Sequence, residues 1–413
     1  QADEGYAKFI SEKFKQALNH DSWHVKTYYQ TFTYGIDMIL KQIHNISLVL
    51  LLICSSCIDT KVDSIFINLE HAESSINYSS IFERVEYINL DAGEECLLSG
   101  IKKIYFDSDT LIFQDSKNEG VFVFNLKDHK LVSHINRIGQ GPEEYHKDNA
   151  IAVDSTSNLI HIYDMMNFKV NVYTYKGEYA YSYKIEYFMR DFAWMDNLLL
   201  IIQPCINKVY KRNGVWLYKP IEKQESLLLE HDGDDQSFEF MSTYIEQSEN
   251  KIYYYDRNDD CIYLINNKSI SRLYKIDLKQ KVPLDIRTAS NQNPKDLNMK
   301  SMMFDFVPSP HSVLLCYFMF GEKENPYRYV LINSKTKETI IFKKFINDMD
   351  DILFADNKTF CINDQSWCRL SQQSEDSETV QLQIMYLQPI ITQYFIDNKS
   401  EIWLLFLIAH SKR

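Results

Sequence analysis

Short apolar segments separated by turn-forming residues dominate the middle of the chain. None of them shows the 3.6-residue spacing of an amphipathic helix, and each has the length of a strand. Four such segments in succession predict one antiparallel meander of four strands, which is the unit of a β-propeller. The clearest set of four is 150–154, 159–164, 170–175 and 179–185.

A glycine-rich stretch, residues 137–145, precedes this meander and reads RIGQGPEEY. Gly139 and Gly141 favour unusual backbone dihedrals and Pro142 lacks a backbone donor, so the stretch cannot continue a strand or a helix. A phosphate-binding loop needs a helix N-terminus after it, whereas a strand follows here. The stretch is therefore predicted to be a turn between two blades.

An aspartate closes an aromatic strand at three places, which indicates a repeat. Asp115 and Asp164 are 49 residues apart, and Asp164 and Asp256 are 92 residues apart, about twice the same period. A divergent unit is expected between the last two, and residues 191–218 supply its apolar segments. A period of this length with four strands per unit is typical of a propeller rather than of a helical solenoid.

Extending the pattern in both directions predicts an all-β, six-bladed β-propeller of four-stranded antiparallel blades over residues 81–409. The strand near 84–90 is expected to pair with the last unit and to close the ring, which removes exposed sheet edges. The six predicted units are 96–140, 141–187, 188–232, 233–282, 300–347 and 348–409.

The front of the chain has the pattern of an export signal at residues 38–57. Lys41 precedes the short apolar core 46–53, and small residues lead to Cys57. The core is too short for the ~30 Å of hydrocarbon in a bilayer, so a signal peptide is favoured over a transmembrane helix. The ending is similar to a bacterial lipobox and predicts lipid attachment at Cys57, although Cys54 stands where that motif prefers an aliphatic residue. Plain secretion and a buried helix are the alternatives.

Two segments flank this signal. Residues 1–37 are polar and lack a starting methionine, so they are interpreted as a doubtful upstream extension, with the product beginning at Met38. Residues 58–80 are predicted to form a linker and a short strand.

Composition supports the predicted β fold and limits the classes of partner that the protein could bind. The chain has 413 residues, more than one hydrophobic core usually supports, and it is 45% hydrophobic and 14% aromatic. A formal charge of -13 argues against a nucleic-acid partner. Most of the eight cysteines stand singly in strand-like segments, which favours buried small hydrophobes over a zinc site, with one or two disulfides left open. They are Cys54, Cys57, Cys96, Cys205, Cys261, Cys316, Cys361 and Cys368.

Several segments resemble the six-bladed β-propeller lipoproteins of Bacteroidota, and the unit 139–183 is similar to the NHL-type blade. Glu143 stands where that family commonly has glycine, and no family pattern is found in residues 364–413. The resemblance implies a cell-envelope propeller and carries over no catalytic residues. The segments that carry it are 81–90, 94–98, 137–145 and 260–265.

Signatures of common enzyme sites are absent from the sequence. It contains neither HExxH nor HxH, which would indicate a metallohydrolase, and no GxSxG nucleophile elbow. The acidic clusters 232–235, 258–260 and 348–351 lack the spacing of an EF-hand loop and are interpreted as solvated turns. No metal, cofactor or catalytic residue is therefore predicted.

Aromatic residues at presumed blade entries are expected to be exposed and, with polar neighbours, give a candidate ligand site for a sugar or a peptide. Packing between sheets is the alternative role for the aromatic residues, which also include Tyr78, Phe188 and Phe304. The candidate site residues are Tyr145, Arg190, Asp191, Trp194, Tyr244 and Glu246.

These observations favour a binding or interaction module in the cell envelope, facing the periplasm or the cell surface and held to the membrane only by an N-terminal lipid. The expected partner is a glycan, a peptide or an envelope protein. The competing hypothesis is a glycan lyase or hydrolase with acid and base on separate blades. Convergence of His, Tyr, Arg or carboxylate side chains at the mouth of the central channel would favour the enzyme.

Overall fold

The computed structural model divides the chain into two units, Gln1–Lys61 and Val62–Arg413. The predicted extension, the signal with Cys57, and the tail beyond residue 388 lie outside the described residues. The structure describes residues 64–90, 101–115, 120–146, 150–185, 189–195, 198–203, 214–230, 245–248, 251–257, 259–266, 269–287, 293, 295–309, 311–350, 353–354, 358–363, 365–372 and 380–388.

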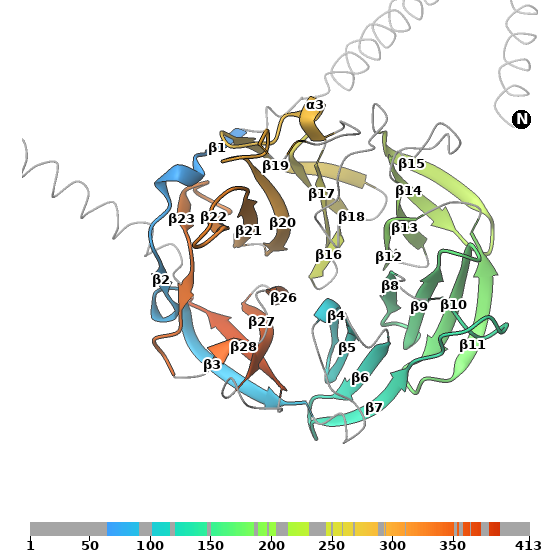
Figure 1. Cartoon of the computed structure of the whole chain (residues 1–413). Helices are drawn as coiled ribbons and strands as arrows, with labels where there is room; N and C mark the ends of the chain where they lie inside the picture. Colours follow the sequence, from blue (N-terminus) through green and yellow to red (C-terminus); the bar gives the residue numbers. More distant parts are fainter. Residues whose placement is uncertain are drawn as a thin grey trace, which may run out of the picture. The chain divides into compact units, whose positions relative to one another are not determined.

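Within these residues the second unit is a ring of β-sheets (Figure 1). Five sheets are blades made from four consecutive antiparallel strands, ordered from the ring axis outwards. The first blade contains β4 (Ile101–Asp107), β5 (Thr110–Asp115), β6 (Val121–Asn125) and β7 (Lys130–Ile135). The second contains β8 (Ile151–Asp154), β9 (Leu159–Asp164), β10 (Lys169–Thr174) and β11 (Tyr179–Lys184).

The other three blades follow in chain order. The third contains β12 (Asp191–Met195), β13 (Leu198–Gln203), β14 (Gly214–Lys219) and β15 (Gln224–Glu230). The fourth contains β16 (Ile245–Ser248), β17 (Lys251–Asp256), β18 (Cys261–Asn266) and β19 (Ser269–Leu278). The fifth contains β20 (Ser301–Pro308), β21 (Ser312–Met319), β22 (Tyr327–Asn333) and β23 (Thr339–Phe342).

A composite sheet occupies the rest of the ring. Its C-terminal strands are β25 (Leu353–Phe354), β26 (Phe360–Asn363), β27 (Ser366–Gln372) and β28 (Val380–Leu387), and its outer strand is β3 (Phe82–Asn89). The pairing of β3 with β28 confirms the predicted closure of the ring. The prediction of six four-stranded blades is wrong, because the structure has five such blades and this irregular sheet, in which β25 and β26 both pair with β27.

Residues 64–81, which we call the N-terminal strap, pack along the outside of the ring. In the strap, β1 (Ser64–Ile67) pairs in parallel with β19, and β2 (Ile76–Asn77) pairs in parallel with β24 (Phe345–Ile346). Two short 3-10 helices, η1 (Leu69–His71) and η2 (Tyr78–Ser80), complete it. Ile67, Leu69 and Tyr78 are buried, so the segment expected to be a linker is an integral part of the ring.

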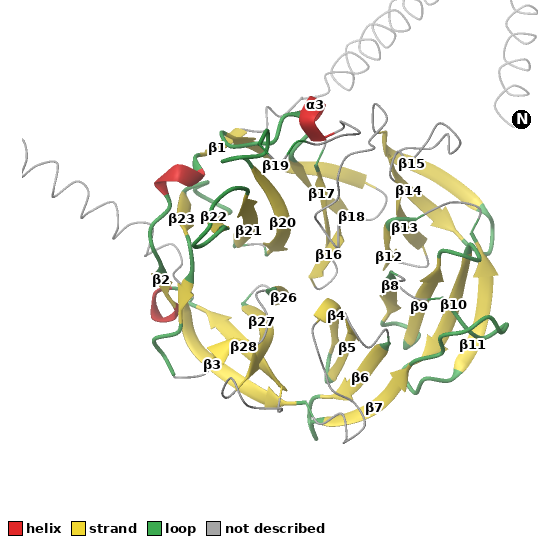
Figure 2. Cartoon of the chain, in the orientation of Figure 1, coloured by secondary structure: helices red, strands yellow, loops and turns green. Residues whose placement is uncertain are grey.

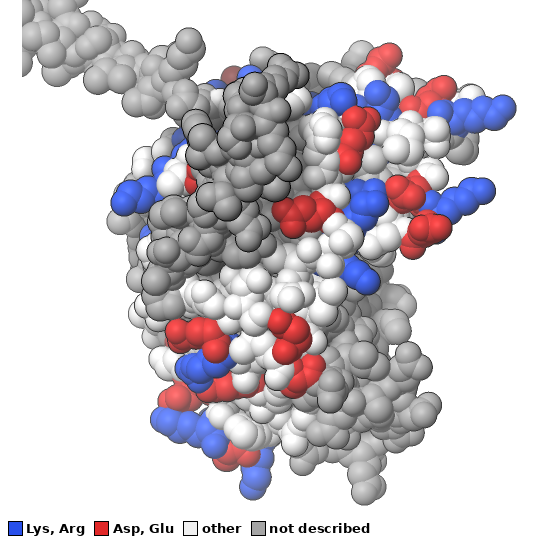
Figure 3. Space-filling model, turned by 90° about the vertical axis from the view of Figure 1, so that its left-hand side faces the viewer, with Lys and Arg blue, Asp and Glu red and all other residues white. Residues whose placement is uncertain are grey.

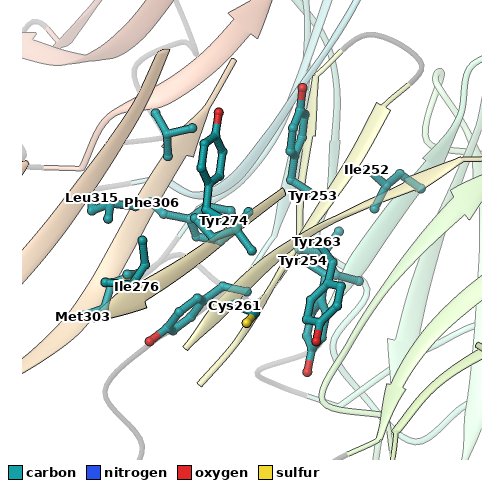
Figure 4. Packing of buried hydrophobic residues seen from close by; sticks show 14 of the residues in the cluster. Ile252, Tyr253, Tyr254, Cys261, Tyr263, Tyr274, Ile276, Met303, Phe306 and Leu315 are labelled. Carbon is teal, nitrogen blue, oxygen red and sulfur yellow. The ribbon is translucent and has the colours of Figure 1, made fainter. Parts of the chain in front are cut away.

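The central strands of the blades are apolar on both faces because neighbouring blades cover both sides. In β5, Leu111, Ile112 and Phe113 are all fully buried. The outermost strand β11 is instead exposed or half-buried along its whole length. Figure 4 shows the packing at the fourth blade, where Ile276 of β19 and Met303 of β20 lie in one apolar cluster. This layering explains why the sequence reads as continuous apolar segments followed by a polar strand.

Helices contribute little to the part of the chain that the structure describes (Figure 2). The α-helix α3 (Leu284–Arg287) has four residues, and no described helix is long and apolar enough to cross a membrane. On the face shown in Figure 3, basic and acidic side chains are interspersed rather than separated.

The cysteines that the structure describes bear out one sequence prediction. Cys261, Cys316, Cys361 and Cys368 are buried and none forms a disulfide, as expected for small apolar side chains in strands. The other four cysteines lie outside the described residues.

Candidate functional site

The N-terminal ends of the innermost strands all lie on one face of the ring. Consecutive strands of a blade alternate in direction, so the starts of the first strands, the turns between second and third strands, and the connections between blades share this face. We call it the entry face. β4, β12 and β16 are innermost strands of three different blades, and they begin near the ring axis (Figure 1).

Three charged residues near the starts of these strands meet in what we call the entry cluster: Lys103, Asp191 and Glu246. The Lys103 Nζ atom lies 2.7 Å from Asp191 Oδ1, and both side chains are almost completely buried. The ammonium also donates a hydrogen bond to the Phe192 carbonyl oxygen at 3.3 Å. Asp191 accepts a further hydrogen bond from the backbone N–H of Ile245, at 3.1 Å. The ion pair therefore connects the first, third and fourth blades.

The protonation states in the entry cluster are set by burial and by charge. Burial is the largest single effect and would lower the pKa of Lys103, but the charge and hydrogen bond of Asp191, with smaller contributions from Tyr105 and Glu246, together raise it above its ordinary value. Burial also raises the pKa of the neighbouring Tyr105 to about 12. The Tyr105 hydroxyl donates a hydrogen bond to the Ile151 carbonyl oxygen at 2.8 Å. Lys103 is thus charged and Tyr105 neutral at physiological pH.

The structure brings together two of the residues predicted for the ligand site, Asp191 and Glu246. Arg190 precedes Asp191 and is half-buried. Trp194, on the same strand, is half-buried and stacks on His161 of the second blade, with ring centroids 4.3 Å apart. Tyr244 lies outside the described residues, as does Phe188.

Tyr145 does not have the exposure that the sequence analysis assumed. Its side chain is 3% exposed, its hydroxyl donates a hydrogen bond to the Ile135 carbonyl oxygen at 2.7 Å, and its ring packs edge-on against Tyr173. Tyr78, in the strap itself, is also buried. The interpretation of these two tyrosines as exposed aromatics is wrong, because each lies at a junction where the chain crosses between sheets.

The sequence analysis missed Lys103 and Tyr105. Lys103 is one of two lysines in the strand-like segment 101–106, and a lysine is rarely buried there unless its charge is paired. Lys103 and Asp191 are 88 residues apart, each near the start of the first strand of its repeat. Comparing equivalent positions across the repeats would therefore have pointed to the pair.

The glycine-rich stretch forms the connection between β7 and β8, as predicted. The Glu144 carboxylate folds back and accepts a hydrogen bond from the Gly141 backbone N–H at 2.7 Å. A Cβ atom on Gly139 would lie 2.0 Å from Glu144 Oε2, so only glycine leaves room for this arrangement. Asn171 of the second blade donates to the Glu144 carbonyl oxygen at 2.8 Å. The polar groups of this loop are thus used to dock it between the blades.

The repeated aspartates have a structural role where their contacts are described. Asp164 accepts hydrogen bonds from the backbone N–H groups of Met166 and Asn167, at 3.2 and 3.3 Å, which fixes the turn after β9. His146 approaches the same carboxylate, with Nδ1 3.2 Å from Asp164 Oδ1.

Residues of the predicted acidic clusters are likewise engaged. Asp259 accepts hydrogen bonds from the Tyr263 hydroxyl at 2.6 Å and from the Cys261 N–H at 3.0 Å. Asp348 accepts one from the Ser79 N–H at 2.9 Å. The described residues include no group of three His, Cys, Asp or Glu side chains placed to hold a metal ion.

Comparison with known proteins agrees with this fold. No curated protein matches the chain. A solved structure from Bacteroides fragilis NCTC 9343, named "Putative exported protein", superposes with a TM-score of 0.62 at 15% identity, covering 79% of this chain and 100% of that one. A member of the DUF4221 family from Bacteroides vulgatus ATCC 8482 gives a TM-score of 0.48 at 10% identity, with 74% and 97% covered. At these identities the first likeness concerns the fold alone.

A family model assigns the chain more directly. The model described as "Domain of unknown function (DUF4934)" matches residues 64–388, from the first described strand to the end of the composite sheet. The match spans well over half of the chain, and the protein belongs to this family.

Proposed function

We propose that this protein is an extracytoplasmic β-propeller that binds a ligand at the entry face, at the cluster of Lys103, Asp191 and Glu246. The observation that carries the proposal is the convergence of these side chains from three blades that are distant in sequence. A fold of this kind hosts many functions, so the argument rests on the site and not on the fold.

The charge of the cluster indicates the ligand chemistry. Counted by themselves, the three side chains of the entry cluster comprise two carboxylates and one ammonium, a net negative charge in a poorly hydrated region where electrostatic interactions are strong. Glu246 is 8% exposed and is the least buried of the three residues. A positively charged ligand group, such as the amine of a peptide or of an amino sugar, is the complement of this site.

Acid–base catalysis is supported less well. The side chains converge as the enzyme hypothesis requires. However, the pKa of Lys103 is raised, and burial raises that of Tyr105 to about 12, so neither group is poised to exchange protons near neutral pH. The cluster therefore favours binding over glycan cleavage.

Ligand binding is tested by thermal unfolding in the presence of amino sugars and of short basic peptides. A ligand present at 100 times its dissociation constant stabilises the folded state by about 2.7 kcal/mol. We expect Glu246→Gln to abolish this stabilisation. The control is Glu322→Gln, since Glu322 is partly buried and paired with Arg328 at 3.0 Å in the fifth blade. Equal stabilisation of both variants, or none of the wild type, contradicts the proposal.

We further propose that the protein is exported and anchored in the cell envelope through a lipid on Cys57. The support is the lipobox-like end of residues 38–57 and the name of the Bacteroides fragilis structure, which describes that protein as exported. The net charge of -13 favours glycan, peptide or envelope-protein partners over nucleic acid. Metabolic labelling with a radioactive fatty acid should label the wild type and not Cys57→Ala. Equal labelling of the two would contradict the anchor.

A further inference from the structure

A second site lies between the fourth and fifth blades, apart from the entry cluster. A small cavity opens there among residues of β17, β19, β20 and β21 and of the two connections beside them. Part of its wall is apolar, with Ile276 and Met303 on opposite blades (Figure 4), and part is polar or charged. The cavity encloses about 30 Å³, which suits a carboxylate or one or two water molecules rather than a drug-sized ligand.

The Tyr317 hydroxyl is the unusual feature of this cavity. The side chain is 1% exposed, and its oxygen has no hydrogen-bond partner among the described residues. A buried polar group left in this state destabilises a protein by roughly 1–3 kcal/mol. Burial, and next the Asp260 carboxylate, raise the pKa of Tyr317 well above its ordinary value, so the hydroxyl keeps its proton and can act as a donor. Tyr317 and Asp260 both line the cavity.

The charges around the cavity favour an anion. Asp260 is already engaged, because it accepts a hydrogen bond from the Tyr255 hydroxyl at 3.1 Å and forms an ion pair with Lys281. Arg257 also lines the cavity, and with Lys281 it leaves one net positive charge. A guanidinium has five donors and an ammonium three, so both can serve more than one partner.

We propose that this cavity binds the carboxylate of a compact organic acid. The Tyr317 hydroxyl donates to one carboxylate oxygen, Arg257 and Lys281 supply the positive charge, and the apolar part of the wall accepts a short carbon chain. The site goes beyond the function proposed above, because the entry cluster is negative and selects a cation. The two sites therefore take ligand groups of opposite charge.

The test is isothermal titration of the whole protein with formate, acetate, propionate and butyrate, with chloride at equal ionic strength as the inorganic comparison. We expect saturable binding of at least one carboxylate and a loss of roughly tenfold or more in affinity for Tyr317→Phe, as removal of a buried hydrogen bond to a charged group predicts. The ligand-free variant should be at least as stable as the wild type, because an unsatisfied hydroxyl is removed.

Tyr175→Phe provides the matched control. The Tyr175 hydroxyl donates a hydrogen bond to Asp107 Oδ2 at 2.9 Å on the opposite face of the ring. This variant should keep the wild-type affinity and lose stability, which is the reverse of the result expected for Tyr317→Phe. If no carboxylate binds, if the cavity holds water only, or if Tyr317→Phe binds as well as the wild type, the proposal is overturned.

Discussion

The connection between the first two blades and the entry cluster each hold a carboxylate in place with hydrogen bonds, but the partners come from different ranges along the chain. Glu144 takes its hydrogen bond from Gly141, three residues away. Asp191 takes its partners from Lys103 and Ile245, which are 88 and 54 residues away. The first arrangement is recognisable in the sequence as a motif, because the residues that approach the Glu144 side chain, Gly139 and Gly141, are glycines only a few positions away. The second arrangement leaves no motif, only single charged residues in three separate repeats.

The largest effect is expected from Lys103→Met, which leaves the Asp191 carboxylate buried without its cation. Removing one partner of a buried ion pair typically lowers the free energy of unfolding by about 3–5 kcal/mol, and urea denaturation measures it. Lys127→Met is the control, because the Lys127–Asp109 pair is 73% and 51% exposed and such pairs contribute about 0–1 kcal/mol. Equal losses in the two variants would show that the entry cluster does not hold the blades together.

Acid should destabilise the contact between the second and third blades, where His161 of β9 stacks on Trp194 of β12. Burial lowers the pKa of His161 from 6.5 to about 4. The unfolded chain therefore takes up the proton first as the pH falls. The stability that this neutral histidine contributes, at most about 3 kcal/mol, is fully present above pH 6.5 and is lost as the pH falls towards 4.

Urea denaturation of the wild type and of His161→Phe between pH 7 and 4 measures this contribution. The phenyl ring keeps the stacking on Trp194 and cannot titrate, so the curve of the variant should be flatter over that range. Parallel curves for the two proteins would assign the acid sensitivity to other groups.

A smaller and more local loss is expected from Gly139→Ala. The added methyl group meets Glu144 Oε2 at 2.0 Å, so the carboxylate must move and release the Gly141 N–H, at a cost of about 1–3 kcal/mol. In a Glu144→Ala background the same substitution should cost much less, since the clash is gone. Urea denaturation of Gly139→Ala, Glu144→Ala and the double variant gives the coupling between the two positions. Additive losses would rule out this explanation.

The smallest expected effect is that of Tyr145→Phe. The variant loses the hydrogen bond to the Ile135 carbonyl oxygen and keeps the packing against Tyr173, so the free energy of unfolding should fall by about 1 kcal/mol. Any ligand found at the entry face should bind this variant with unchanged affinity. A loss of binding would restore Tyr145 as a ligand residue.

The sequence predicts the fold well where the signal is local. The meander at 150–185 and the turn at 137–145 were predicted because strand alternation and glycine chemistry act over a few residues. The closure by β3 was also predicted, from the need to cover two sheet edges. The number of four-stranded blades was not, because after residue 348 the apolar segments are short and the first strand of the composite sheet is divided between β25 and β26.

The candidate site was predicted only in part, for the same reason. Asp191 and Glu246 were singled out because each stands beside aromatic residues at the start of a repeat. Lys103 was not, since its meaning depends on a carboxylate two blades further along the ring. The exposure of Tyr145 was misjudged because burial at the end of a loop is decided by the next blade and not by the loop itself.

The composite sheet determines which step of folding closes the ring. Gln381 and Asn89 are partners in neighbouring strands although 292 residues separate them in the sequence. During synthesis β3 emerges before all five blades and its partner β28 emerges after them, so the edge of β3 stays open while the five blades assemble. Such long-range pairing is slow and leaves hydrogen-bonding groups accessible to wrong partners. The final step of folding is therefore the one most exposed to aggregation, and a chain cut short before residue 380 has no way to finish it.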